Sequence, residues 1–145
     1  MSVRSAAPTG ALEQIVWPRT ARRRDDGVVE IAGIGLDEIA ERFGTPAYII
    51  DEADVRSRAR AYREAFARAF AAIGTQADVY YAGKAFLSSH VAQWVTEEGL
   101  RLDVCSGGEL AIAKKAGVPG ENIGMHGNNK GVAEIDDALA YGVGR

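Results

Sequence analysis

From residue 78 onward the sequence repeats one pattern three times: a short apolar segment, a small or polar turn, and a helix closed by a glycine. Strands that are apolar along most of their length are typical of parallel sheets, because helices cover both faces. The repeat therefore predicts a run of βα units around a parallel sheet. The expected strands are 78–82, 100–104 and 122–126, and the expected helices are about 88–98, 108–116 and 132–141.

The sequence before this repeat predicts two further strands and two helices. A short strand is expected over 28–31 and a short helix over 36–43, where apolar residues fall on one helical face. The apolar segment 47–50 is expected to form a buried strand. The acidic residues 51–54 suit the N-terminus of a long helix that ends at Gly74. The stripe that this helix is expected to bury consists of Val55, Ala59, Tyr62, Phe66, Ala69 and Ile73.

The segment 47–50 and the three strands of the repeat would give four parallel strands, which fit either an open doubly wound sheet or part of a (β/α)₈ barrel. A barrel needs eight strands and roughly 250 residues, whereas the chain has 145. The sequence stops at Arg145, where the repeat would place another strand. We therefore expect an N-terminal piece of a longer protein.

Composition argues against several classes of function. With 17 Lys and Arg against 20 Asp and Glu, the net charge is −3, which offers no basic field for nucleic acid. No stretch approaches the ~20 apolar residues of a membrane span, and residues 1–14 lack the apolar core of a signal peptide. Cys105 is the only cysteine, so no intrachain disulfide can form, as is usual in a reducing compartment. We therefore expect a cytoplasmic protein that binds neither nucleic acid nor membrane.

Lys84 is the first candidate for chemistry, because sites in parallel α/β folds gather at the carboxyl ends of the strands. It follows the strand 78–82 and has apolar and aromatic neighbours in the sequence. An apolar environment disfavours the charged ammonium and would make the amine a nucleophile for carbonyl carbons, including a substrate carbonyl or pyridoxal phosphate. The alternative is an ordinary turn lysine, with a packed stem and an amine in water.

Asp103 and His126 lie at the ends of the next two expected strands. A carboxylate within a buried strand is costly unless it is paired. Asp103 is therefore either part of a structural ion pair or a site carboxylate near Lys84. His126 is either a hydrogen-bonded core histidine or a polar wall of the site. A metal is not expected, because the only other histidine, His90, lies on an expected helix with no ligand spacing between the two.

The turn after the strand 100–104 offers weaker candidates. Gly107 and Gly108 precede a helix N-terminus, where backbone amides can bind phosphate. A tight βα turn explains the same pair more simply. Cys105 has no strongly cationic neighbours in the sequence, so an inert thiol is expected.

Four segments together resemble the ornithine/diaminopimelate/arginine decarboxylase family. The stretch 81–86 (YAGKAF) resembles its pyridoxal-phosphate attachment signature, although Phe86 stands where Asn is commoner. The stretch 102–117 (LDVCSGGELAIAKKAG) resembles its Asp-x-x-Ser-x-Gly-Glu-Leu segment, and 35–51 (GLDEIAERFGTPAYIID) resembles the entry into its barrel. Residues 123–130 (IGMHGNNK) are most similar to the members that act on diaminopimelate.

This resemblance implies a fold and a cofactor. Residues 47–145 would form the first half of an alanine-racemase-like (β/α)₈ barrel, and residues 1–46 would contribute to a β domain. Lys84 would hold pyridoxal 5′-phosphate covalently, with Asp103 near the Lys84 end of the cofactor and His126 under or beside its ring. Family members generally work as homodimers, so a homodimer is also expected.

The resemblance implies decarboxylation of meso-2,6-diaminopimelate to L-lysine and CO₂ in lysine biosynthesis. Alternatives are another pyridoxal-phosphate-dependent decarboxylase or a racemase on the same barrel, or a non-enzymatic pyridoxal-phosphate-binding protein of cofactor homeostasis. The family's phosphate loop and catalytic cysteine would lie beyond Arg145. We therefore expect the chain alone to be inactive and Cys105 not to be that cysteine.

Overall fold

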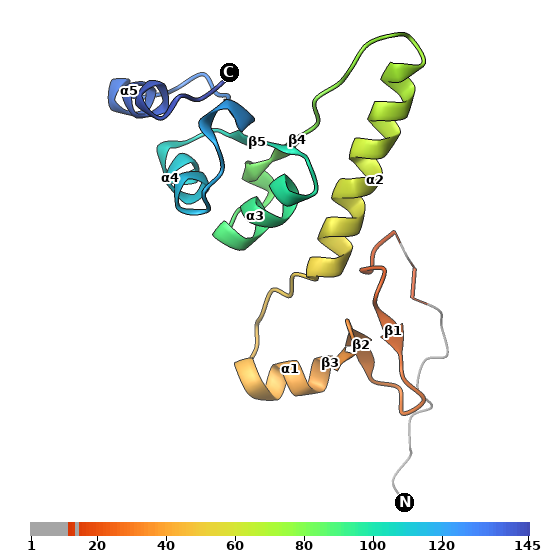
Figure 1. Ribbon diagram of the computed structural model, residues 1–145. Helices are drawn as coiled ribbons and strands as arrows, with labels where there is room; N and C mark the ends of the chain where they lie inside the picture. The colour runs from red at the N-terminus through yellow and green to blue at the C-terminus, as the bar shows by residue number, and fades with distance from the viewer. Residues whose placement is uncertain (1–11, 14) are drawn as a thin grey trace, which may run out of the picture. The chain divides into compact units, whose positions relative to one another are not determined.

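The computed structural model describes residues 12, 13 and 15–145. Most of the stretch assessed for a signal peptide, residues 1–11 and 14, lies outside the described residues. The chain divides into two compact units, residues 1–54 (unit 1) and residues 55–145 (unit 2). Figure 1 shows both units, with the helices α1 to α5 and the strands β1 to β5 labelled. The proposed boundary between a β domain and a barrel, after residue 46, stays a prediction.

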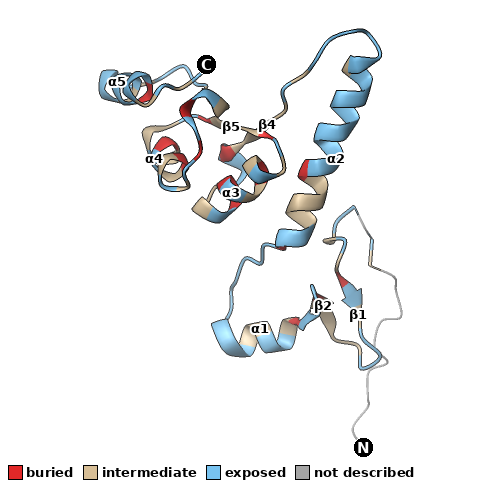
Figure 2. Ribbon diagram, in the orientation of Figure 1, coloured by how far each residue is buried: buried red, intermediate tan, exposed pale blue. Residues whose placement is uncertain are grey.

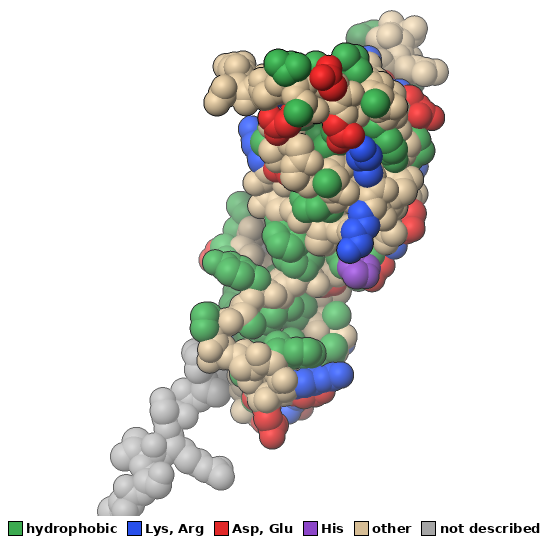
Figure 3. Space-filling view, turned by 90° about the vertical axis from the view of Figure 1, so that its left-hand side faces the viewer, with side chains coloured by type: hydrophobic (Ala, Val, Ile, Leu, Met, Phe, Trp, Pro, Cys, Tyr) green, Lys and Arg blue, Asp and Glu red, His purple; other side chains and the backbone are tan. Residues whose placement is uncertain are grey.

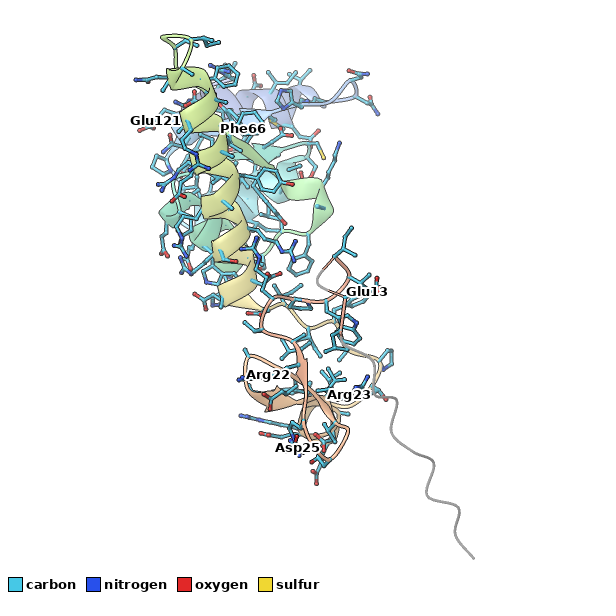
Figure 4. The ribbon with its side chains drawn as sticks, turned by 90° about the vertical axis from the view of Figure 1, so that its right-hand side faces the viewer. Glu13, Arg22, Arg23, Asp25, Phe66 and Glu121 are labelled. Atoms are coloured by element: carbon cyan, nitrogen blue, oxygen red, sulfur yellow. The ribbon has the colours of Figure 1, made fainter. Side chains whose placement is uncertain are left out.

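Unit 1 contains a small antiparallel sheet followed by a helix. The strands β1 (Arg22–Arg23), β2 (Val29–Ile31) and β3 (Ile34–Gly35) pair in the order β1-β2-β3. Figure 4 labels the two arginines of β1, of which Arg22 pairs with Glu30 on β2 at 2.5 Å. The helix α1 (Leu36–Phe43) begins directly after β3. The predicted strand over 28–31 and helix over 36–43 are thus confirmed.

The prediction of a buried strand over residues 47–50 is wrong for this structure. The segment has no regular secondary structure and all four residues are exposed, with Tyr48 100% exposed. A strand requires a neighbour that accepts its backbone hydrogen bonds, and no strand of the described part of unit 1 pairs with this segment. Apolar composition alone therefore does not make the segment a strand.

Unit 2 is built from three βα units around a parallel sheet. The strands β4 (Tyr80–Ala82), β5 (Arg101–Val104) and β6 (Ile123–Met125) are parallel and lie in the order β4-β5-β6. Figure 1 shows the helices that follow them in chain order. These elements are the 3₁₀ turn η1 (Gly83–Ala85) with α3 (Ser89–Glu97) after β4, α4 (Gly107–Lys115) after β5, and η2 (Gly120–Asn122) and α5 (Val132–Tyr141) around β6. The predicted repeat is confirmed.

The core of unit 2 lies between one face of this sheet and the helices. Alternate strand residues point to opposite faces, so Leu102 and Val104 face the helices while Asp103 faces the other way. The buried cluster combines Leu102, Val104 and Ile123 of the sheet with Val91, Ala92 and Val95 of α3 and Leu110 and Ala113 of α4. The apolar face of the sheet packs against the helices. Asp103, a candidate site residue, lies on the opposite face.

The long helix α2 (Glu52–Ala71) forms as predicted, but the predicted burial of its apolar stripe is only partly right. Ala59 is buried, whereas Tyr62 is 62% exposed and Phe66 lies on the exposed second half of the helix (Figures 2 and 4). Unit 2 contains α2 from Val55 onward. Of these helix residues, Val55 and Ala59, near its start, pack against the core of the unit. No described helix combines the length and apolar composition needed to cross a bilayer.

Candidate functional site

Lys84 lies in the turn η1, directly after the carboxyl end of β4. Its side chain is exposed, so the apolar enclosure expected from the sequence is not present in unit 2. The aromatic neighbours are engaged elsewhere: the Tyr81 hydroxyl donates to the Phe86 carbonyl oxygen at 2.7 Å. Among the described residues, no hydrogen bond or ion pair engages the Lys84 amine. The amine is therefore free to react with a carbonyl carbon.

The turn that carries Lys84 is held close to β5. Ala82 is opposite Asp103 in the parallel register, and Gly83 is buried. A Cβ atom at Gly83 would lie 2.8 Å from the Asp103 carbonyl oxygen, closer than real Cβ atoms approach. Glycine at this position therefore allows the Lys84 turn to approach the neighbouring strand.

Asp103 and His126 are each other's partners. The Asp103 carboxylate Oδ1 is hydrogen-bonded to Nδ1 of the His126 imidazole. The side chain of Asp103 is 22% exposed and that of His126 is 70% exposed. His126 is therefore not a core histidine, and the partner of Asp103 is this histidine. The backbone N–H of His126 donates to the Val104 carbonyl oxygen at 2.9 Å, which fixes the start of the turn after β6.

Cys105, the residue after β5, has an exposed thiol. A hydrogen bond with Glu109 is the main cause that raises the pKa of this thiol, with burial and the charges of Glu109 and Asp103 adding to it. The positive charge of Lys84 acts weakly in the opposite direction. The thiol therefore stays protonated at neutral pH, which supports the expectation of an inert cysteine.

The sequence reasoning missed Glu134, which lies in the first turn of α5. Its carboxylate accepts the N–H of Gly107 at 2.6 Å, so this amide at the start of α4 is already engaged. That contact argues against a phosphate site at the pair Gly107 and Gly108. The spacing from Gly131 to Glu134 is that of a capping box, but glycine replaces the Ser or Thr by which the motif is recognised in a sequence.

An amine, a carboxylate and an imidazole thus follow or end three neighbouring parallel strands. Lys84 and His126 belong to the turns after β4 and β6, and Asp103 lies between them on β5. Within the described part of the chain, no three His, Cys, Asp or Glu side chains are arranged to hold a metal ion. The amine can react with a carbonyl carbon, and the imidazole can hydrogen-bond to a polar group of a ligand.

Comparison with known families agrees with this chemistry. Residues 52–145 match the model of the pyridoxal binding domain of pyridoxal-dependent decarboxylases. The match covers more than half of the chain, and the chain therefore belongs to this family. It confirms the predicted family and the predicted cofactor, pyridoxal phosphate.

Within this family the chain is similar to diaminopimelate decarboxylases. It is 54% identical over 129 residues to that of Mycobacterium tuberculosis, covering 89% of this chain and 27% of the relative. It is 46% identical over 125 residues to that of Bacillus subtilis, covering 86% of this chain and 28% of the relative. The chain thus spans little more than a quarter of the length of these curated relatives.

A solved structure supports the same likeness. The crystal structure of the diaminopimelate decarboxylase from M. jannaschii matches 88% of this chain and 29% of its own chain, with a TM-score of 0.79 and 35% sequence identity. That decarboxylase has also been solved in complex with L-lysine. The likeness confirms the predicted α/β fold class, part of a barrel preceded by an N-terminal segment.

Proposed function

We propose that the protein containing this chain is a pyridoxal-phosphate-dependent decarboxylase that converts meso-2,6-diaminopimelate to L-lysine and CO₂. The observation that carries the proposal is the unpaired Lys84 amine at a strand end, within a chain 54% identical to a diaminopimelate decarboxylase over 89% of its length. The relative solved with L-lysine supports the choice of product.

The residues of unit 2 fit pyridoxal phosphate. When bound, this cofactor supplies an electron sink for the charge that remains on the substrate carbon as CO₂ leaves. The Lys84 amine is the nucleophile that would hold it through its carbonyl carbon. The Asp103 carboxylate fixes the Nδ1 side of His126, so that Nε2 is the nitrogen left for the cofactor or for water.

We further propose that residues 1–46 belong to a β domain and that residues 47–145 belong to the cofactor-binding barrel. The antiparallel strands of unit 1 and the parallel βα units of unit 2 support this division. The family resemblance supports a homodimer, a cytoplasmic location and a place in lysine biosynthesis. Size-exclusion chromatography of the complete protein tests the dimer.

The decisive experiment uses the complete protein, pyridoxal phosphate and meso-2,6-diaminopimelate, with release of CO₂ and L-lysine as the readout. Lys84→Ala should abolish lysine formation and the cofactor adduct that borohydride fixes to the protein. Lys115→Ala is the matched control, because Lys115 is an exposed lysine at the end of α4. It should leave both readouts unchanged.

Other outcomes separate the alternatives. A reducible adduct on Lys84 without lysine formation would point to another decarboxylase if other amino acids yield CO₂. It would point to a racemase if they change configuration without releasing CO₂. An adduct with neither reaction would favour a cofactor-homeostasis protein. The absence of any adduct would contradict the assignment of Lys84 as the residue that holds the cofactor, and with it the proposed function.

A further inference from the structure

The carboxylate of Glu134 binds the N-terminal ends of two helices at once. Its Oε2 accepts the N–H of Gly131, the N-cap of its own helix α5, at 2.9 Å. Its Oε1 accepts the N–H of Gly107, the first residue of the neighbouring helix α4, at 2.6 Å. The first N–H groups of a helix have no partner within it, so one side chain here satisfies a donor from each helix.

These two helices belong to the βα units that carry Asp103 and His126. The turn that ends at Gly107 follows β5, the strand of Asp103, and the turn that ends at Gly131 begins at His126. The same two βα units are therefore joined twice. One link is the Asp103–His126 hydrogen bond at the strand ends, and the other is Glu134 at the helix starts.

The contact with α4 is closely fitted. A Cβ atom at Gly107 would lie 3.1 Å from Oε1 and 3.2 Å from Cγ of Glu134, so glycine leaves the room that this side chain occupies. Hydrogen bonds from Gly131 and Gly107 are the main causes that lower the pKa of the Glu134 carboxyl, with a smaller contribution from Lys130. Glu134 is therefore charged at neutral pH, where the positive ends of two helix dipoles stabilise it.

The turn between His126 and α5 depends on this anchor. Its first residue is fixed by the hydrogen bond from the His126 N–H to Val104, and its last residue by Glu134. Between them, the one side-chain hydrogen bond within the turn that the described structure shows is that from the Lys130 amine to the Gly127 carbonyl oxygen at 2.9 Å. Release of the far end would loosen the segment that orients the exposed imidazole.

We propose that Glu134 is a positioning residue of the cofactor site: it fixes the turn after β6 to the start of α4 and thereby holds His126 against Asp103. The part that concerns the cofactor rests on the proposed function. Glu134 itself touches neither the Lys84 turn nor the imidazole in the described contacts, so it acts through His126.

Glu134→Gln is the variant that tests this role. The amide keeps the length of the side chain but removes the charge, and its NH₂ group cannot accept a hydrogen bond. One of the two backbone N–H groups is then left without its partner. Glu134→Asp is a second variant, because the shorter carboxylate cannot span both helix starts.

Asp137→Asn is the matched control. Asp137 lies on α5 as well, and its Oδ1 accepts from the Lys114 amine at 2.7 Å, so it also links α5 to α4. Lys114 lies in the last turn of α4, at the opposite end from Gly107. The control therefore weakens the contact between the helices without touching the two turns.

The first measurement is amide hydrogen exchange in the complete, cofactor-free protein. Glu134→Gln should speed exchange at Gly107 or Gly131 by about tenfold, since a hydrogen bond to a charged group is lost. Asp137→Asn should not change it. Equal protection in Glu134→Gln and the wild type would overturn the two-helix anchor.

The second measurement is the affinity for pyridoxal phosphate alone. The absorbance of the bound cofactor reports binding, at a temperature where all variants are folded. Glu134→Gln should weaken it by about tenfold, the lower end of what loss of a supporting contact costs. In a His126→Ala background the same substitution should have no further effect, because residues that act as a unit are not additive.

A purely structural role predicts a different result. The losses caused by Glu134→Gln and His126→Ala would then multiply, and Asp137→Asn would weaken affinity as much as Glu134→Gln. Either result would overturn the inference while leaving the decarboxylase proposal intact. Conversely, cofactor binding without lysine formation would remove the proposed substrate and leave the role of Glu134 standing.

Discussion

At the scale of single residues, the Asp103–His126 pair determines what the strand ends can do chemically. The carboxylate fixes one ring nitrogen and so sets the direction of the exposed imidazole. The sequence indicated both residues, because each ends or occupies an apolar strand. It did not indicate that they pair, because pairing depends on the register that aligns Asp103 with Gly124, two residues before His126.

Asp103→Asn should lower the affinity for pyridoxal phosphate and the turnover of the complete protein by about 10–100-fold. The amide loses the charge that stabilises the hydrogen bond with His126. Cofactor titration and a lysine assay measure the two effects. Asp78→Asn is the control, because Asp78 pairs with Arg101 at 3.0 Å, two residues before Asp103 on β5. Equal behaviour of both variants would contradict the role of Asp103.

Gly83→Ala should destabilise the protein by about 1–3 kcal/mol, because its new methyl group would meet the Asp103 carbonyl oxygen. The Lys84 turn and β5 must then move apart. Gly108→Ala should be neutral or stabilising, since the nearest atom to its Cβ would be 3.9 Å away and alanine favours a helix. Urea unfolding of both variants measures the difference, and an unchanged midpoint for Gly83→Ala would refute the close approach.

At the scale of elements, capping side chains and ion pairs hold the helices of unit 2 in place. Ser88 and Ser106 cap α3 and α4, and positive-φ glycines follow α3, α4 and α5. Serine before a helix and glycine after it are local signals, so the sequence predicted these three helices well. The reach of Glu134 from α5 to α4 is not local, so no sequence pattern indicated it.

Acid should weaken the Glu134 link between α4 and α5. Because the folded-state pKa of this carboxyl is lowered from 4.5, its contribution to stability is complete above about pH 4.5 and is lost as pH falls through the lower folded value. The difference in urea midpoint between the wild type and Glu134→Gln should therefore shrink below that pH. A difference that stays constant down to full protonation would argue against the charged anchor.

Glu98 should contribute more than Glu97 to the contact between α2 and the end of α3. Its carboxylate, 12% exposed, pairs with both Arg56 and Arg60, and the neighbouring Glu97 pairs with Arg56 at 2.7 Å. Glu98→Gln should cost about 1 kcal/mol at low salt and less at high salt. Glu97→Gln, at a 60% exposed position, is the control and should cost less. Urea unfolding at two salt concentrations checks both.

At the scale of the whole molecule, apolar surface in unit 2 stays uncovered. A groove of about 420 Å³ lies along α2 and β4, lined mainly by Val55, Ala59, Tyr62, Tyr81, Val95 and Leu100. Figure 3 shows hydrophobic and acidic side chains next to one another on the face that α5 presents. The sequence predicted the strands and helices but not which faces stay open, because burial depends on neighbours that a periodic pattern does not specify.

The 145-residue chain on its own should therefore associate with itself. Val132 and Leu139 on α5 are 75% and 72% exposed, and β4 is an edge strand of the parallel sheet. Exposed apolar faces and free strand edges favour association with a second copy. Sedimentation over a range of concentrations should show growing oligomers and binding of a hydrophobic dye. Leu139→Gln should reduce both, whereas Ala140→Gln, at an exposed alanine on the same helix, should not. A chain that stays monomeric and binds no dye would show that these exposed apolar surfaces do not drive association.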